Sequence, residues 1–209
     1  MGQNKAASWA YAEEQSNEPE LIAQARAEAE ELGIVSLSPA TGRFLALLAS
    51  LPHIHSIAEV GTGTGVSALY MLGASPQAAI TTIDIEAEAQ NYARRHFSQL
   101  GLRTSRYRLI NGRSADLLPR LADAAYDLVL IDGDPLEAAG DTQEAVRMLR
   151  PGGILLVAHA LNGDRVANPA RRDEATVSLR NLGLEILESE ALHSSLIPLG
   201  DGLLVAVKR

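Results

Sequence analysis

The sequence predicts an α/β fold built on a mostly parallel sheet, and three observations support this prediction. Apolar, strand-like segments alternate with helical patterns along most of the chain, as they do in successive βαβ units. Residues 126–131 and 154–158 are almost continuously apolar, which is typical of central strands that helices cover on both faces. A glycine-rich turn at residues 61–65 joins the first strand of the series to a helical pattern.

Two helices are expected before the sheet begins. Pro19 suits the first position of one helix, and Gly33 suits its end. Ser38 and Pro39 start a second helix in the same way, and its apolar positions continue as far as Pro52.

Seven strands are then expected, with helices between the first six. The strands cover about residues 56–60, 80–85, 106–110, 126–131, 153–159, 184–190 and 202–207. The helical patterns cover residues 65–73, 86–100, 114–121, 136–149 and 170–182. Only a loop around residues 193–200 joins the last two strands, so we expect these to form an antiparallel pair at the edge of the sheet.

Residues 18–209 are expected to form one domain, with N-terminal helices at 18–52 and a Rossmann-like core at 53–209. Residues 1–17 form a polar N-terminal arm that contains Trp9 and Tyr11. This arm is either a frayed tail or a segment whose aromatic side chains pack on a ligand or on a partner chain.

The composition disfavours several functional classes. The chain has 209 residues, 46% of them hydrophobic, which suits one domain with a full core. No apolar run approaches the roughly 20 residues of a membrane span, and the first residues do not resemble a signal peptide. The lack of cysteine excludes disulfides and zinc–thiolate sites, and it is compatible with the cytoplasmic location that we expect. The net charge of −8 disfavours a nucleic-acid substrate.

The spacing of the glycines distinguishes between kinds of nucleotide site. Gly61 and Gly63 fit the dinucleotide fingerprint G-x-G-x-x-G, but the third glycine, Gly65, comes one residue too early. The turn also lacks the lysine of a Walker loop. The pattern Glu59-x-Gly61-x-Gly63-x-Gly65 resembles motif I of class I S-adenosylmethionine (SAM) methyltransferases, and the alternative is an ordinary glycine-rich turn.

Ligands of open α/β sheets bind beyond the carboxyl ends of the strands, and this rule selects further candidates. Asp84 ends the second strand, 23 residues after Gly61, where a carboxylate can accept hydrogen bonds from both ribose hydroxyls of an adenosine. The alternative for Asp84 is a surface acid. Ser114 follows the third strand and could cap a helix or contact an adenine edge. Asp132 and Asp134 follow the fourth strand, where Asp132 could face the sulfonium of SAM.

One of the five histidines stands at the carboxyl edge of the sheet. His159 ends the fifth strand and could act as a base near neutral pH, or simply hydrogen-bond to a loop. His53 and His55 lie at the opposite edge, and His96 is expected to face solvent from a helix. His193 is expected in the last loop, without the pattern of a hydrolase triad.

With these residues placed, the chain resembles the catechol O-methyltransferase-like family of SAM-dependent O-methyltransferases, in particular its bacterial small-molecule members. The resemblance runs from about residue 38 to the C-terminus, through the stretches 38–42, 58–72, 82–84, 130–132, 149–153 and 199–203. It implies a Rossmann-like class I methyltransferase fold with strand order 3-2-1-4-5-7-6, strand 7 antiparallel, and a homodimer. The contacts with SAM that it implies are at Glu59, Gly61, Gly63, Ser67, Asp84, Ser114 and Asp132, and Gly65 completes the glycine motif.

The metal site of the family is incomplete in this chain. The family holds a divalent metal, usually Mg²⁺, with an Asp after strand four and an Asp-Asn pair after strand five. Asp132 matches the first acid, but Ala158 and His159 replace the pair, and Pro135 replaces a lysine often found nearby. These groups do not form the oxygen-rich site that suits Mg²⁺. We therefore expect no metal, and a softer ion on His159 with Asp132 or Asp134 is the alternative.

The predicted function is the transfer of a methyl group from SAM to a hydroxyl of a small molecule. Without a metal to acidify the acceptor, a base must take its proton, and His159, with Asp134, is assigned that role. The alternatives are a SAM-binding sensor or partner protein without catalysis, a nucleotide-dependent oxidoreductase, and an aminopropyltransferase-like enzyme.

Overall fold

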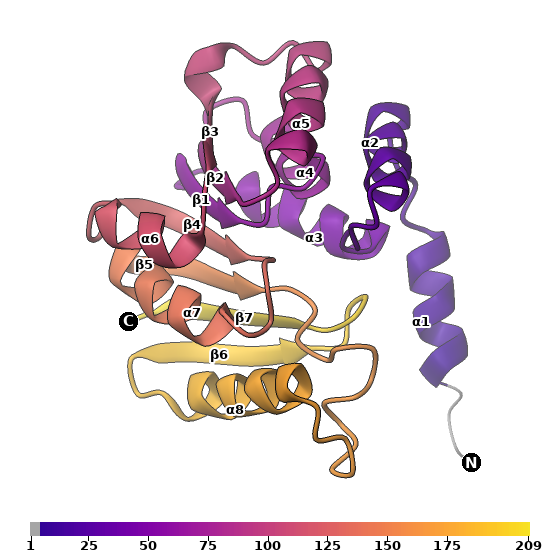
Figure 1. Ribbon diagram of the computed structural model, residues 1–209, viewed down its shortest axis with the longest axis vertical. Helices are drawn as coiled ribbons and strands as arrows, with labels where there is room; N and C mark the ends of the chain where they lie inside the picture. The colour runs from indigo at the N-terminus through magenta and orange to yellow at the C-terminus, as the bar shows by residue number, and fades with distance from the viewer. Residues whose placement is uncertain (1–4) are drawn as a thin grey trace.

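A seven-stranded sheet runs through the computed structural model, which describes residues 5–209 (Figure 1). Its strands are β1 (Ser56–Val60), β2 (Ala79–Asp84), β3 (Tyr107–Asn111), β4 (Tyr126–Ile131), β5 (Leu149–Val157), β6 (Leu192–Ile197) and β7 (Leu203–Lys208). They lie in the order β3-β2-β1-β4-β5-β7-β6. Strands β1 to β5 pair in parallel, and β7 is antiparallel to both of its neighbours. The predicted fold class and strand order are confirmed.

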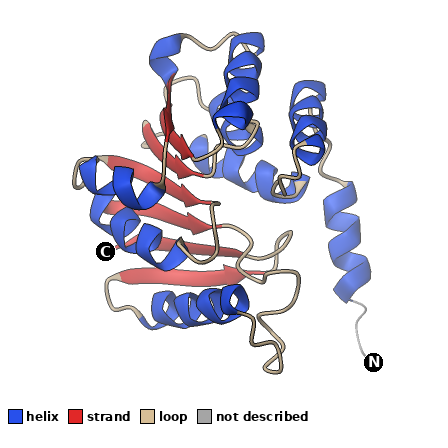
Figure 2. Ribbon diagram, viewed as in Figure 1, coloured by secondary structure: helices blue, strands red, loops and turns tan. Residues whose placement is uncertain are grey.

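Helices cover both faces of the sheet (Figure 2). They are α1 (Lys5–Glu14), α2 (Glu20–Glu31), α3 (Pro39–Ala49), α4 (Val66–Ala74), α5 (Ala87–Gln99), α6 (Ser114–Leu117), α7 (Ala138–Met148) and α8 (Glu174–Glu188), with short 3₁₀ turns η1 (Thr104–Arg106) and η2 (Leu118–Arg120). Within residues 5–209, none of these helices has the length and apolarity needed to span a membrane.

Alternate residues of the central strands belong to two separate cores. Leu128 and Leu130 of β4 pack with α2 to α5 on one face, while Val129 and Ile131 pack with α7 and α8 on the other. Because both faces are buried, the strand needs apolar residues at every position. This accounts for the continuous apolar run in the sequence.

The predicted start of α3 and end of α2 are confirmed. Ser38 is the N-cap of α3 and accepts a hydrogen bond from the backbone N–H of Thr41. Gly33 has φ +73°, and the N–H of Ile34 bonds the carbonyl of Ala29 at 2.9 Å, which is the pattern of a Schellman motif. Pro19 stands one position earlier than expected, as the N-cap of α2.

The prediction for the last helix and the strand after it was wrong. We expected a strand at residues 184–190 and a loop near 193–200, but α8 continues to Glu188 and β6 covers Leu192–Ile197. Leu184 and Leu187 are exposed on α8, and the alternation of Leu184 and Ile186 around Glu185 gave a false strand signal. β6 is an edge strand with a largely open face, and its apolar pattern is correspondingly weak.

α1 lies at the outside of the fold, beyond α2 (Figure 1). It contains no buried residue, and Trp9 and Tyr11 are largely exposed. The first four residues of the predicted arm lie outside the described part of the chain.

A buried hydrogen-bond network lies at the carboxyl end of β1. Glu59 accepts hydrogen bonds from the hydroxyls of Ser67 and Thr82, each at 2.5 Å. The Thr62 hydroxyl lies 2.7 Å from that of Thr82, and the Gln90 amide donates to Thr62 at 3.2 Å. All five residues are buried. Burial raises the pKa of Glu59 to about 7, against the opposing effect of the two hydroxyl donors.

A second buried carboxylate, that of Asp127, lies at the opposite edge of the sheet, near the start of β1. One Asp127 oxygen accepts from the backbone N–H groups of His55 and Ser56, each at 2.8 Å, and the other lies 2.9 Å from the Arg150 guanidinium. The Asp127 side chain is only 3% exposed. It therefore joins β4 to the start of β1 and to β5.

We expect Asp127→Ala to lower the free energy of unfolding by about 2 kcal/mol or more, because two backbone donors and a guanidinium lose their acceptor. Chemical denaturation measures this. Asp123→Ala is the matched control, since the Asp123 side chain is 76% exposed in its ion pair with Arg147, and it should change stability by no more than about 0.5 kcal/mol. Equal effects of the two substitutions would contradict the role of Asp127.

Glu59 should make stability depend on pH in a specific direction. Its pKa is about 7 in the folded chain and 4.5 in ordinary surroundings. Between these values the unfolded chain releases a proton that the folded chain keeps, so the contribution of Glu59 to stability falls as pH rises, by about 1 kcal/mol per pH unit. Denaturation from about pH 5 to pH 7 should show this fall in wild type and in the control Glu88→Gln, and a smaller one in Glu59→Gln, in which the raised pKa of Asp132 still contributes. Parallel curves for wild type and Glu59→Gln would contradict it.

Candidate active site

A cleft of about 290 Å³ opens at the carboxyl edge of the sheet, beyond the ends of the paired strands β1 and β4, where the strand order reverses. This is the topological switch point at which open α/β sheets bind ligands. Its walls come from the glycine turn, the ends of β2 and β4, the turn after β3, and the segment between α2 and α3. Of the predicted site residues, it brings together Gly61, Gly63, Ser67, Asp84, Ser114, Asp132 and Asp134.

The three glycines of the turn have different structural tasks. Gly61, Gly63 and Gly65 have φ values of +92°, +50° and +95°, a region that favours glycine. A Cβ on Gly61 would overlap the carbonyl oxygen of Asp132, and a Cβ on Gly65 would lie 3.0 Å from Phe97. At Gly63 the nearest atom would be 3.6 Å away, so this residue opens on the cleft. Gly65 does not line the cleft but packs against α5.

Asp84 presents its carboxylate at the floor of the cleft. One oxygen accepts from the N–H of Gly63 at 2.7 Å and the other from the N–H of Glu86 at 2.8 Å. Each carboxylate oxygen can accept a second hydrogen bond. The arrangement therefore fits a ligand with two adjacent hydroxyl donors.

Glu59 lies beneath the cleft rather than in its wall. It is 1% exposed, and it is linked to the cleft through Ser67, which both lines the wall and donates to it. The contact of Glu59 with a ligand stays a prediction, and in this structure Glu59 supports Ser67 of the cleft wall.

Ser114 lies on the far wall and does not cap a helix. α6 begins at Ser114 itself, after an N-cap at Arg113 that makes no side-chain cap bond. The Ser114 hydroxyl donates to Glu137 at 3.1 Å, and Glu137 also accepts from Arg113 at 2.5 Å. The hydrogen bond from Arg113 lowers the pKa of Glu137. This wall is therefore a fixed polar surface near the end of β3.

Two acids follow β4, in different surroundings. Asp132 is largely buried, and burial, followed by the charges of Glu59 and Asp84, raises its pKa well above the ordinary value. Asp134 also lines the cleft, but its carboxylate accepts a hydrogen bond from the N–H of Leu136 at 2.9 Å in an exposed turn. Asp132 is the acid whose charge needs a partner.

His159 lies two residues beyond β5, against two carboxylates. Its Nε2 is 3.4 Å from Asp132 and its Nδ1 is 3.2 Å from Asp201. Within residues 5–209, no hydrogen bond or ion pair joins His159 to Asp134, the residue predicted to share the role of base with it. His159 is a neighbour of Asp132 and does not itself line the cleft.

The residues present do not fit the metal site of the family. Ala158 offers only a methyl group where that site has a carboxylate, and His159 turns its two nitrogens toward Asp132 and Asp201. Among the described residues 5–209, no three side chains of the ligand types are grouped to hold a metal ion. A Mg²⁺ site would require more oxygen ligands than Asp132 supplies.

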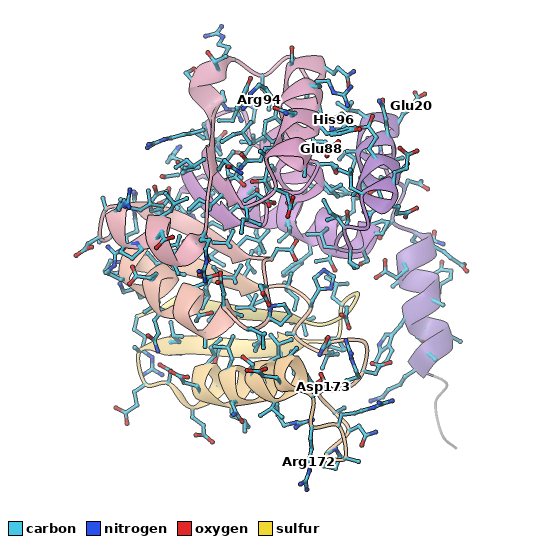
Figure 3. All side chains as sticks on the ribbon, viewed as in Figure 1. Glu20, Glu88, Arg94, His96, Arg172 and Asp173 are labelled. Carbon is cyan, nitrogen blue, oxygen red and sulfur yellow. The ribbon has the colours of Figure 1, made fainter. Side chains whose placement is uncertain are left out.

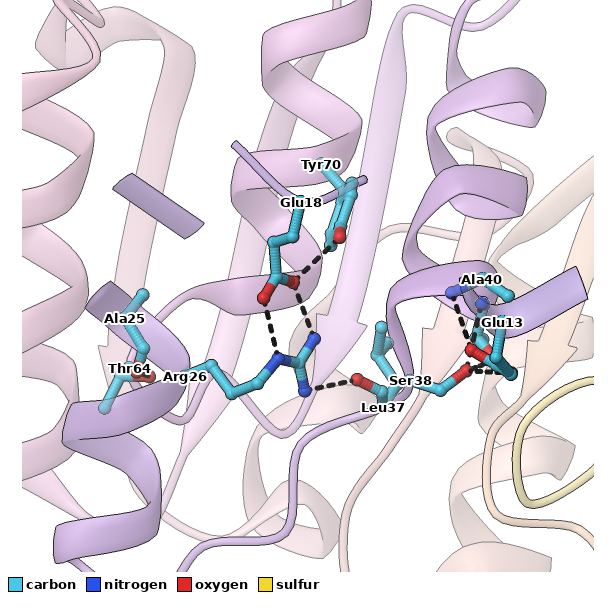
Figure 4. Close-up of polar contacts among 10 residues, drawn as sticks. Glu13, Glu18, Ala25, Arg26, Leu37, Ser38, Ala40, Thr64 and Tyr70 are labelled. Carbon is cyan, nitrogen blue, oxygen red and sulfur yellow. Dashed lines mark hydrogen bonds and ion pairs between the residues drawn. The ribbon is translucent and has the colours of Figure 1, made fainter. Parts of the chain in front are cut away.

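The segment before α3 is held in place by an ion pair (Figure 4). Arg26 binds both oxygens of Glu18, at 2.8 and 3.0 Å, and donates to the carbonyl of Leu37 at 2.7 Å. The Tyr70 hydroxyl donates to the same Glu18 at 2.8 Å. Since residues 34–37 form one wall of the cleft, this cluster fixes that wall to α2 and α4.

α1 and α2 are also joined to the site. Glu13 of α1 accepts from the hydroxyl of Ser38 at 2.8 Å and from the N–H of Ala40 at 3.2 Å (Figure 4). The Thr64 hydroxyl, in the glycine turn, donates to the carbonyl of Ala25 at 2.6 Å.

The prediction that His96 faces solvent was wrong. His96 is fully buried, on the side of α5 that faces α2 (Figure 3). Its Nδ1 lies 2.9 Å from the carbonyl oxygen of Thr64 and its Nε2 lies 2.8 Å from Glu28. His193 is in β6 rather than in a loop.

Sequence reasoning missed several residues that support the site. Asp201, Thr82, Thr62, Gln90 and Glu137 make the polar contacts described above, but they come from separate segments. Of these five residues, Asp201 alone has a signal in its neighbouring sequence. Glycines flank it on both sides, and such glycines often mark a close approach of the backbone to another group.

The sequence profile of the O-methyltransferase family matches residues 12–209. The protein named "Probable O-methyltransferase Rv1220c" from Mycobacterium tuberculosis is 45% identical over 201 residues, which is 96% of this chain and 90% of that protein. A Corynebacterium glutamicum protein of known crystal structure is 32% identical in sequence to this chain. The two structures superpose with a TM-score of 0.86, over 95% of this chain and 94% of that protein.

The O-methyltransferase TomG from Streptomyces achromogenes, solved in complex with SAM, has a TM-score of 0.85 over 100% of this chain and 99% of its own, at 22% identity. At that identity the likeness concerns the fold alone. The profile match over almost the whole chain, together with the closely matching relatives, shows that this chain belongs to the O-methyltransferase family.

Proposed function

We propose that this chain binds SAM in the cleft beyond the carboxyl ends of β1 and β4 and catalyses methyl transfer to a hydroxyl of a small molecule. The observation that carries the proposal is the meeting of the glycine turn with the Asp84 carboxylate at the cleft floor. TomG, which has the same fold, was solved with SAM. When bound, SAM supplies a methyl group on a positively charged sulfonium, which makes that methyl electrophilic.

The residues of the cleft fit the parts of this cofactor. Asp84 would accept hydrogen bonds from the ribose hydroxyls, and Ser114 and its neighbours would lie against the adenine. Gly63 leaves room for the chain backbone to approach the ligand closely. Asp132, which is buried with His159 as its one cationic neighbour among the described residues, would face the sulfonium charge. Glu59, Gly61, Gly65 and Ser67 hold this surface in shape.

The acceptor oxygen must lose a proton as it takes the methyl group. Methyl transfer is an in-line displacement, so the walls of the cleft contribute by orienting the two reactants. We assign His159 as the base that takes this proton, and Asp134 on the cleft wall orients the acceptor hydroxyl. His159 reaches the cleft through Asp132, which lines it.

The reaction proposed here needs no divalent metal. Support comes from the residues at the metal position, where Ala158 and His159 replace oxygen ligands, and from the two His159 nitrogens, each of which faces a carboxylate.

We also propose that the enzyme is a cytoplasmic homodimer, in which residues 18–209 form the methyltransferase domain and residues 1–17 an arm. The family resemblance supports the dimer, and the lack of cysteine is compatible with the location. The net charge of −8 favours a small-molecule acceptor over nucleic acid or a membrane. Trp9 and Tyr11, exposed on α1, are available to a ligand or to the partner chain.

The alternative of a SAM-binding protein without catalysis is not supported by the comparisons, because the named relatives are O-methyltransferases. The oxidoreductase and aminopropyltransferase alternatives gain no support from them either.

Asp84→Asn should weaken the binding of S-adenosylhomocysteine by roughly 10- to 100-fold, because it removes the negative charge from two hydrogen bonds to the ribose. Isothermal titration calorimetry measures the dissociation constant. Asp116→Asn, an exposed acid outside the cleft, is the control and should bind as wild type does. An unchanged dissociation constant in Asp84→Asn would place the adenosine elsewhere.

Treatment with EDTA followed by dialysis should leave activity unchanged, because the chain lacks the oxygen ligands of the family's metal site. The assay is methyl transfer from labelled SAM to a panel of small phenols and catechols. A metal-dependent family member, treated in parallel, shows that chelation was effective. Loss of activity that Mg²⁺ restores would contradict the metal-free mechanism while leaving SAM binding intact.

A further inference from the structure

Three side chains stand in a row at the carboxyl edge of the sheet, and the proposed function uses only two of them. His159 lies in the middle, with Asp132 at 3.4 Å from Nε2 and Asp201 at 3.2 Å from Nδ1. They come from the loop after β4, the loop after β5 and the loop before β7. Asp201 is 42 residues from His159 in sequence, so the fold rather than local structure brings them together.

Backbone N–H groups of the turn after His159 hold Asp201 in place. The second oxygen of the Asp201 carboxylate accepts from the N–H of Gly163 at 2.6 Å, and the backbone carbonyl of Asp201 accepts from the N–H of Leu161 at 2.9 Å. The carbonyl of Gly202 accepts from Ala160 at 3.0 Å. Gly202 has φ +84°, and a Cβ there would overlap Leu161. The Asp201 loop therefore rests directly on the turn that follows His159.

The backbone of His159 is constrained in the same turn. Its φ of +54° is a left-handed conformation that costs a residue with a Cβ about 1–2 kcal/mol. The N–H of Asn162 bonds the His159 carbonyl at 2.9 Å, and Asn162, Gly163 and Asp164 also have positive φ. Such conformations persist where surrounding contacts determine them, and they gather at functional sites. Here the strained turn aims the imidazole between the two acids.

The two nitrogens of His159 have unequal surroundings. Nδ1 faces Asp201, a carboxylate that is one-third exposed and fixed by Gly163. Nε2 is buried and makes no hydrogen bond within the described residues, and the oxygen nearest to it belongs to Asp132, which lines the cleft. A neutral imidazole carries its proton on the nitrogen that has an acceptor. The geometry thus favours a proton on Nδ1 and a free lone pair on Nε2.

We propose that Asp201 is a positioning residue that holds His159 in the Nδ1–H tautomer and so keeps Nε2 free to take the acceptor's proton. This inference rests on the proposed function of His159. When the acceptor oxygen bonds to the methyl carbon, the carbon–sulfur bond breaks and its electron pair stays on sulfur as a neutral thioether. The acceptor's proton passes by way of Asp132 to Nε2, and the resulting imidazolium lies between two carboxylates. The two carboxylates stabilise this buried charge, which would be costly to bury without them.

Asp201→Asn tests this placement with little change of shape. The amide oxygen can still accept from Gly163, which turns the amide NH₂ toward Nδ1. A donor there forces Nδ1 to become the acceptor and moves the proton to Nε2, the tautomer that cannot act as the base. Asp164→Asn, an exposed acid in the neighbouring turn, is the matched control because asparagine tolerates its left-handed backbone.

The primary measurement is the tautomer itself, read from the ¹⁵N chemical shifts of the imidazoles in the complex with S-adenosylhomocysteine. The signals of His159 are identified by their loss in His159→Gln. We expect Nδ1–H in wild type and in Asp164→Asn, and Nε2–H in Asp201→Asn, with the affinity for S-adenosylhomocysteine unchanged in all three. The Nε2–H form in wild type, or the same tautomer in wild type and Asp201→Asn, would overturn the inference.

Activity separates this inference from the function on which it rests. With labelled SAM and the panel of phenols and catechols, Asp201→Asn should lower kcat by roughly 100-fold or more, with KM for SAM unchanged. If His159→Gln is as active as wild type, His159 is not the base and the proposed mechanism fails. If His159→Gln is inactive while Asp201→Asn shows wild-type kcat, the mechanism stands and the positioning role of Asp201 is refuted.

Discussion

The buried carboxylate of Glu59 is the interaction on which the geometry of the cleft depends. It accepts hydrogen bonds from Ser67 at the start of α4 and from Thr82 in β2, so it ties β1, which leads into the glycine turn, to the helix that follows the turn and to the neighbouring strand. Burial raises its pKa to about 7, which means that the fold keeps this group where its charge is disfavoured. The position of the N–H of Gly63, and with it the contact to Asp84 at 2.7 Å, follows from that arrangement.

The electrostatics of the cleft follow from the same carboxylate. Glu59 and Asp84 both raise the pKa of Asp132, after the larger effect of its burial, and Asp84 raises that of Glu59. Acids that repel one another at one edge of a sheet are stabilised by a cation placed among them. Under the proposed function, the sulfonium of SAM is such a cation and is lost as a neutral thioether on transfer. The cleft should therefore favour the charged cofactor over the neutral product, which assists product release.

The parts of the site that could be predicted from the sequence are those whose signals are local. The glycine spacing and the acids at strand ends placed Gly61, Gly63, Asp84 and Asp132 at one cleft, because the carboxyl ends of parallel strands meet at one edge. Contacts between distant segments were out of reach. The burial of His96 depends on the packing of α5 against α2, and the contact of His159 with Asp201 depends on the insertion of β7 beside β5. The error at β6 has a similar cause, since an edge strand packs on one side only.

The replacement at residues 158 and 159 can be understood as one change in charge rather than two separate losses. A divalent cation in this position is balanced by carboxylates, and removing the cation alone would leave those acids buried and unpaired. Ala158 removes one of the carboxylates, and His159 offers the remaining one, Asp132, a group that can carry a positive charge. Asp201 then completes the arrangement from the far side. Under the proposed mechanism, such a site exchanges a permanent cation for one that forms only while His159 holds the acceptor's proton, so the positive charge is present at the step that requires it.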